Sequence, residues 1–162
     1  MKTLNVLIFT AAMLTGAFAT PTALAHSDDV LDTQKAPNGG QLRMAGVYHF
    51  ELVVARDSKE ARDNPVLVFV TDHAGAKIPT VGAGGTATIL AGKQKASVKL
   101  VPDGDNRLKG VGKYASTPDM KAVVSVTMAG KPAEQARFTP LAPMAPAAPP
   151  SAAKDGHTDH KH

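Results

Sequence analysis

Six histidines are the side chains of this sequence whose type and spacing could do chemistry. Three of them lie within the last six residues, where neutral imidazoles on a flexible chain could wrap several nitrogens around one Cu, Ni or Zn ion. These are His157, His160 and His162. The alternative interpretation is a solvated polar terminus. Because ordering such a tail costs about 1–2 kcal/mol per fixed residue, we expect its affinity for an ion to be modest.

A second candidate site lies on a predicted strand. His49 and Glu51 are two residues apart, so both side chains leave the same face of the strand, about 7 Å apart at a rise of ~3.3 Å per residue. Two metal ligands on a rigid strand are better preorganised than two on a loop. The competing interpretation is a surface hydrogen bond. His73 falls in a predicted turn, and it joins this site only if the fold brings it close to His49 or His26.

The N-terminus predicts export and supplies one more possible ligand. Residues 1–25 have a basic start, an apolar run shorter than the ~20 residues of a stable membrane span, and a small-x-small cleavage site that ends at Ala25. Cleavage there makes His26 the first residue, and its α-amine and ring nitrogen could chelate one Cu(II) ion. A cut after Ala19 is the alternative. We expect no membrane span to remain after cleavage.

Composition restricts the remaining chemistry. The chain has no cysteine, so it can form neither disulfides nor thiolate metal sites. Its basic residues are scattered and aromatic residues are few, which argues against a nucleic-acid partner. No nucleophile motif, phosphate-binding glycine loop or zinc-protease pattern occurs, so we do not expect an enzyme.

The positioning elements are predicted to be strands. Short β-branched runs with period-two alternation are separated by Gly, Pro, Asn and Asp turns. This spacing predicts an all-β domain, a single antiparallel immunoglobulin-like β-sandwich of six or seven short strands, with an up-and-down barrel as the alternative. The predicted strands are 47–54, 65–71, 86–91, 96–101, 107–114, 121–128 and 133–139.

Polar and Pro/Ala-rich segments flank this domain. Residues 26–37 are predicted to form a flexible arm, and residues 140–162 a disordered Pro/Ala linker that ends in the histidine-rich tail. The predicted organisation is therefore a signal peptide over 1–25, the arm over 26–37, the β-sandwich over 38–139 and the tail over 140–162.

Two motifs of the domain carry a resemblance to a known family. Asn38-Gly39-Gly40-Gln41-Leu42, followed by the strand Tyr48-His49-Phe50-Glu51-Leu52, resembles the N-terminal β-sandwich segment of periplasmic adaptor subunits of heavy-metal efflux pumps, and small periplasmic proteins related to it. Runs 70–75 and 120–126 are also similar, so the resemblance spans about residues 38–139. The family pattern begins His-Gly-Gly, whereas this chain has Asn38. The long coiled-coil hairpin and the barrel of a full adaptor are missing.

The resemblance implies a periplasmic β-sandwich that handles copper, zinc, cobalt or nickel, and it matches His49 and Glu51 to family positions. Because Asn38 is a poor substitute for imidazole, we expect a site that needs that histidine to be weakened. The leading hypothesis is a periplasmic copper-binding buffer or carrier in metal tolerance, with components of an efflux system as possible partners. The alternative is a metal-free β-sandwich module that contacts an efflux pump or another envelope protein.

Overall fold

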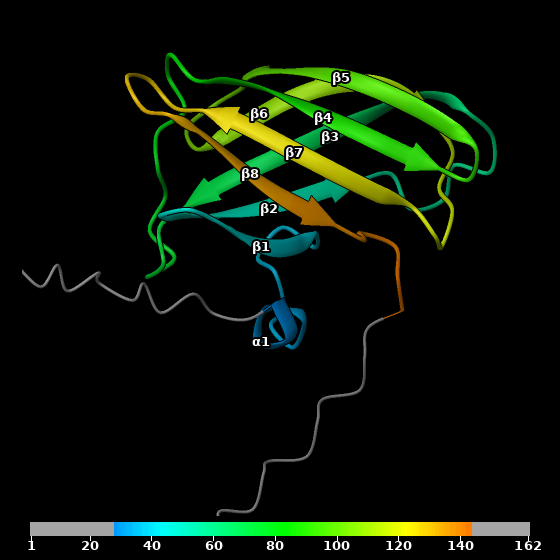
Figure 1. Ribbon diagram of the computed structural model, residues 1–162, viewed down its shortest axis with the longest axis horizontal. Helices are drawn as coiled ribbons and strands as arrows, with labels where there is room; N and C mark the ends of the chain where they lie inside the picture. The colour runs from blue at the N-terminus through cyan, green and yellow to red at the C-terminus, as the bar shows by residue number, and fades with distance from the viewer. Residues whose placement is uncertain (1–27, 144–162) are drawn as a thin grey trace, which may run out of the picture.

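Eight antiparallel strands and one short helix make up residues 28–143, the part of the chain that the computed structural model describes (Figure 1). The helix α1 spans Asp28–Asp32 and precedes all the strands. The strands are β1 Gln41–Ala45, β2 Tyr48–Val54, β3 Arg62–Thr71, β4 Gly84–Ala91, β5 Gln94–Pro102, β6 Arg107–Tyr114, β7 Lys121–Thr127 and β8 Ala133–Phe138. Over this range, no helix is long and apolar enough to cross a membrane.

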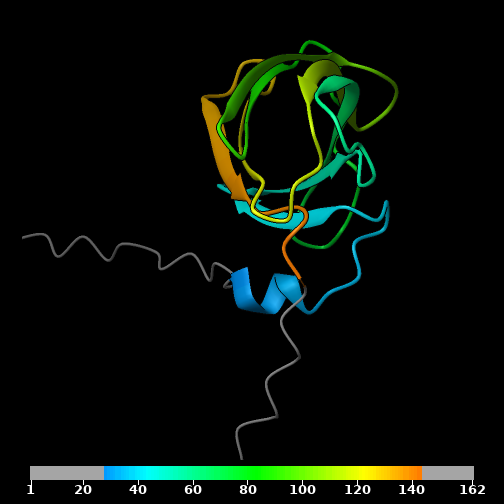
Figure 2. The ribbon, with the colours of Figure 1, turned by 90° about the vertical axis from the view of Figure 1, so that its right-hand side faces the viewer.

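The strands join into one sheet in the order β1-β2-β3-β6-β5-β4-β7-β8. The sheet curls until β1 and β8 lie side by side, and Figure 2 shows the resulting nearly closed barrel end-on. The seam between β1 and β8 is bridged by a side chain, because the amide N–H of Thr139 donates to Oε1 of Gln41 at 2.8 Å. The run β3-β6-β5-β4 is a Greek key, since β4, β5 and β6 are sequential and β3 lies beside β6.

The junction between β5 and β6 makes the sheet continuous. Their short ladder pairs Pro102 with Leu108, next to the connecting turn, and Val101 with Lys109. Further along β6, a Cβ at Gly110 or Gly112 would collide with Val98 of β5, so glycine lets the two strands approach closely. This approach joins β1-β2-β3-β6 to β5-β4-β7-β8.

The all-β antiparallel class predicted from the sequence is confirmed, but the arrangement differs from the predicted immunoglobulin-like sandwich. All seven predicted strands are present, with ends within three residues of those expected. The additional strand, β1, has the sequence Gln-Leu-Arg-Met-Ala, which lacks the β-branched alternation that marks the others. The observed sheet is closer to the barrel that was the alternative prediction. Its strand order is not up-and-down, because the neighbour of β3 is β6 and not β4.

The core fills the barrel, because alternate residues of each strand point inward. On β3, Val66, Val68 and Val70 are fully buried while the residues between them are partly exposed. On β2, Phe50 and Leu52 are also fully buried. Period-two alternation in the sequence therefore identifies the core face of these strands, and it leaves the intervening residues for the outer face.

The segment that precedes β1 is packed against the barrel. α1 lies beneath the seam between β1 and β8 (Figure 2), and Leu31 of this helix is 2% exposed. Ala36, in the loop that follows, is also buried. The polar composition of residues 26–37 predicts a flexible arm, whereas residues 28–37 contain α1 and bury two apolar side chains. Asp28 and Asp32, which make this segment polar, pair with Arg43 of β1 and hold the segment in place.

Tyr114 ties together β6, β3 and the residue that follows β2. Its buried hydroxyl donates to the carbonyl of Pro65 on β3 at 2.6 Å and accepts from the amide N–H of Ala55, just after β2, at 3.1 Å. Burial raises the pKa of Tyr114 above its ordinary value, and the hydrogen bond from Ala55 opposes that rise in part. The hydroxyl thus provides a hydrogen-bond partner for two backbone groups, the N–H of Ala55 and the C=O of Pro65.

We expect Tyr114→Phe to lower the free energy of unfolding by about 1–2 kcal/mol, because it leaves the N–H of Ala55 and the C=O of Pro65 without this partner. Urea denaturation measures the change. Tyr48→Phe is the matched control, since Tyr48 is half-buried and its hydroxyl makes no hydrogen bond to residues 28–143. Equal losses in the two variants would contradict this role.

Candidate functional site

His49 and His73 lie together on the outer face of the sheet. His49 is on β2, in register with Thr71 of β3, and its side chain is 8% exposed. His73 is two residues beyond Thr71, in the turn that leaves β3, and it is exposed. The centroids of the two imidazole rings are 5.0 Å apart and their planes are inclined by 29°. The fold therefore satisfies the condition under which His73 joins the predicted site.

Asp72 shapes the turn that carries His73. Its Oδ1 accepts hydrogen bonds from the amide N–H groups of Ala74 at 2.9 Å and Ala76 at 2.8 Å. The turn also needs a residue with positive φ, and Gly75 supplies it at φ 81°. Asp72 and Gly75 together fold the chain back on itself directly after β3, which places His73 over His49.

Glu51 is on the same face of β2 as His49, as predicted, but its carboxylate holds the backbone. Oε1 accepts from the amide N–H groups of Asn38 at 2.8 Å and Gly40 at 2.9 Å. Oε2 accepts from Nδ2 of Asn38 at 2.8 Å. Because the side chain is only 3% exposed, these bonds replace the water that a carboxylate needs. Glu51 thus anchors residues 38–40 across β2.

Asn38 takes part in this anchor in a way that its residue type alone does not reveal. Its side-chain amide donates to Oε2 of Glu51, so Asn38 lies next to the face that carries His49. Asn38 supplies two of the three hydrogen bonds that the Glu51 carboxylate accepts. The residue at this position therefore holds Glu51 and offers no imidazole to the site.

A second set of charged bonds holds α1. The guanidinium of Arg43 donates to both carboxylate oxygens of Asp32, at 2.6 and 3.0 Å, and Asp28 lies 3.6 Å from it. The side chain of Gln41 adds a hydrogen bond to Asp32 at 3.1 Å. The hydrogen bond from Arg43 is the largest influence on the pKa of Asp32, and it holds that pKa below its ordinary value despite partial burial.

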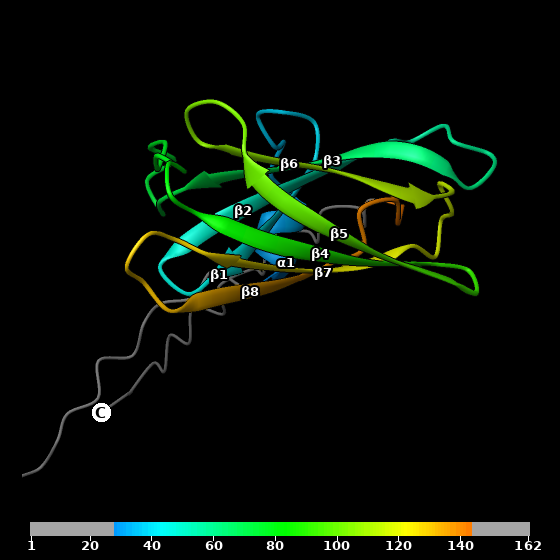
Figure 3. The same ribbon diagram turned by 90° about the horizontal axis from the view of Figure 1, so that it is seen from above.

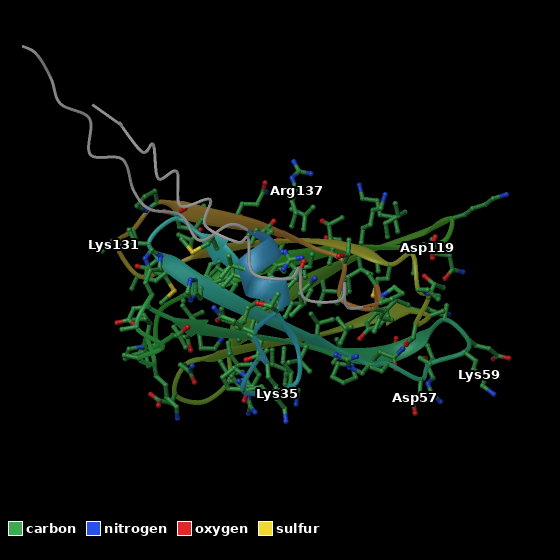
Figure 4. All side chains as sticks on the ribbon, turned by 90° about the horizontal axis from the view of Figure 1, so that it is seen from below. Lys35, Asp57, Lys59, Asp119, Lys131 and Arg137 are labelled. Atoms are coloured by element: carbon green, nitrogen blue, oxygen red, sulfur yellow. The ribbon has the colours of Figure 1, made fainter. Side chains whose placement is uncertain are left out.

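The histidine pair lies in a pocket of about 450 Å³. Its floor is the outer face of β1, β2 and β3, and its walls are the loop after α1 and the turn after β3. Lys35, which Figure 4 labels in the loop after α1, and Lys77 add positive charge to the rim. Other lining residues include Asn38, Leu42, His49, Glu51, Phe69, Thr71 and His73.

The structure brings together part of the predicted ligand set. His49, Glu51 and His73 line one pocket, whereas His26 and the tail histidines His157, His160 and His162 lie outside the described residues. Within residues 28–143, no group of three histidine, aspartate or glutamate side chains converges as a metal site would. The described site therefore offers a pair of imidazoles.

Sequence reasoning predicted the turn over 72–75 that carries His73, because Asp72 and Gly75 are typical turn residues. It did not indicate that this turn lies over β2. It also missed Arg43, which holds α1 and looked like one of many scattered basic residues. No local signal indicates the partner of Arg43.

No family model, curated protein or solved structure matches this chain. The resemblance to the adaptor segments of heavy-metal efflux pumps therefore stays a prediction that depends on the motifs around Asn38 and His49.

We expect Glu51→Gln to lower the free energy of unfolding by about 1–3 kcal/mol, because an amide N–H₂ would replace an oxygen that now accepts hydrogen bonds from N–H donors. Chemical denaturation at pH 7 measures the loss. The control is Glu60→Gln, an exposed position whose side chain makes no hydrogen bond within the described region. If both variants were as stable as the wild type, the anchoring role of Glu51 would be wrong.

Asp32→Asn tests the anchor of α1 through its pH dependence. The carboxyl has a lower pKa in the folded than in the unfolded chain, so its contribution is present above the unfolded value of ~3.9 and is lost as pH falls through the folded value. We expect wild type to be more stable than Asp32→Asn at pH 7 and the difference to shrink below pH ~3. Denaturation at several pH values measures it, with the exposed Asp57→Asn as control. A pH-independent difference would contradict the ion pair.

Proposed function

We propose that this protein is an exported, periplasmic metal-binding protein that holds copper at the pair His49 and His73. The single observation that carries the proposal is the approach of the two rings to 5.0 Å inside a pocket. Metal–imidazole bonds are ~2.0–2.1 Å long, so two rings this close could share one ion once each ring turns a nitrogen toward it.

The chemistry of the available ligands favours copper. The chain has no cysteine, which leaves imidazole as its strongest ligand for transition metals. Among divalent first-row ions, Cu(II) binds nitrogen sites most tightly, and zinc, nickel and cobalt follow as alternatives. The resemblance of residues 38–52 to segments of heavy-metal efflux adaptors supports the same group of ions.

A site with two protein ligands suits a buffer or carrier. Structural zinc sites close the coordination sphere with four protein ligands and release the ion slowly, whereas two imidazoles leave positions open for water or for an acceptor's ligand. Glu51 is excluded from this ligand set in our proposal, because its oxygens accept three hydrogen bonds. His26 and the tail histidines remain predicted additional ligands.

The metal-free interaction module is the second candidate. It is favoured by the size of the pocket, since about 450 Å³ with Leu42 and Phe69 in its lining is far more space than one ion occupies. A short segment of an envelope protein or efflux pump could occupy that space.

Thermal melting with and without Cu(II), Zn(II) and Ni(II) distinguishes the two candidates. An ion bound only by the folded state raises the melting temperature, and the stabilisation grows with the logarithm of its concentration. We expect this shift with copper in the wild type, and its loss in the double variant His49→Ala with His73→Ala. No shift with any ion would favour the interaction module.

A matched variant separates the pocket from the tail. Replacing His157, His160 and His162 with alanine should reduce the number of ions bound per chain, measured by titration calorimetry, while the copper-dependent melting shift remains. If the tail variant lost the shift and the His49/His73 variant kept it, the pocket would not be the site.

A further inference from the structure

Basic side chains gather on the side of the barrel opposite α1. Strands β4 to β7 form this side, which is seen from above in Figure 3, while α1 lies beneath the barrel in Figures 1 and 2. Four exposed lysines of this side, on β5 and β6, define what we call the basic face. They are Lys95 and Lys99 on β5, and Lys109 and Lys113 on β6.

No acidic side chain on these four strands balances the charge. The nearest carboxylate along the ladders is that of Asp63 on β3, which is in register with Lys113. Over residues 28–143, each ion pair involves an arginine or Lys77, and none involves a lysine of the basic face. The positive charge of this face is therefore directed at solvent.

Exposed apolar side chains lie among these lysines. Val101 on β5 and Val111 on β6 are 47% and 58% exposed, and Val101 is in register with Lys109. Leu90 on β4, in register with Lys95, is 43% exposed. A partner bound through charge alone, such as an acidic polymer, would gain nothing from these side chains. A lipid surface accepts both kinds, because lysine stems lie along apolar groups while their ammonium groups reach the phosphates.

We propose that the basic face binds the surface of a membrane rich in anionic phospholipid, as a peripheral contact. The lysines of the basic face are attracted to the negative surface potential of such a membrane, and Val101 and Val111 enter its interfacial region. The barrel would then rest on β5 and β6. α1 would face away from the lipid, and the pocket on the outer face of β2 would stay open to solvent.

This inference does not depend on metal binding. The face and the pocket share no residue, so a failure of copper binding would leave the membrane contact intact, and the reverse also holds.

Co-sedimentation with vesicles tests the proposal. We expect the full chain to bind vesicles of phosphatidylglycerol and phosphatidylcholine in equal parts, to bind pure phosphatidylcholine vesicles at least tenfold more weakly, and to lose affinity as salt is raised. Equal binding to both vesicle types, or no binding to either at low salt, would overturn the proposal.

Charge reversal locates the contact. Lys95→Glu, Lys99→Glu and Lys109→Glu together should lower the affinity for anionic vesicles at least tenfold. The control has the same change in net charge at positions away from the basic face, all labelled in Figure 4: Lys59→Glu, Lys131→Glu and Arg137→Glu. If both triple variants lost the same affinity for anionic vesicles, net charge alone would explain the binding, and the assignment of the contact to the basic face would be overturned. Unchanged melting temperatures show that both variants fold.

A third variant distinguishes lipid from an acidic protein. Val101→Ser with Val111→Ser preserves every charge and should weaken binding to anionic vesicles, while binding to polyglutamate stays the same. Binding to polyglutamate without binding to anionic vesicles, or vesicle binding that ignores the serine substitutions, would assign the face to an acidic protein and overturn the lipid proposal.

Discussion

The buried carboxylate of Glu51 is the interaction on which the arrangement of the site depends. An ionised carboxyl that is 3% exposed is tolerated only because three N–H donors surround it, and all three come from Asn38 and Gly40. The bond network therefore makes the segment before β1 cross the outer face of β2. The same crossing forms one wall of the pocket over His49, so a single charge determines both local stability and the shape of the site.

The nearly closed sheet has one seam, and the charged N-terminal segment covers it. Open strand edges expose unpaired backbone groups that invite pairing with other chains. Here β1 is short, Gln41 bridges to Thr139, and α1 lies beneath the seam with Arg43 bound to Asp32. The barrel consequently has two different sides. One is covered by the N-terminal segment and contains the histidine pair, and the other is bare and positively charged.

Much of the fold follows from local pattern, and the errors have physical reasons. Alternation along β2 and β3 identifies Phe50, Leu52 and the valines of β3 as core, because a strand with one buried face must alternate. β1 escaped prediction because an edge strand covered by other elements needs no regular alternation. The sandwich was expected because period-two patterns do not reveal whether two sheets join. Close contact between β5 and β6 at Gly110 and Gly112 decides that point.

The sequence by itself determined the residue chemistry: imidazole without thiolate, an all-β domain, and His49 beside Glu51 on one strand face. Only the tertiary structure decided that His73, 24 positions further along the chain, completes a pair with His49 and that Glu51 binds backbone instead. The physical reason is strand register. Pairing His49 with Thr71 brings the turn at Asp72 over β2, and register depends on the burial of whole faces, which no short motif encodes.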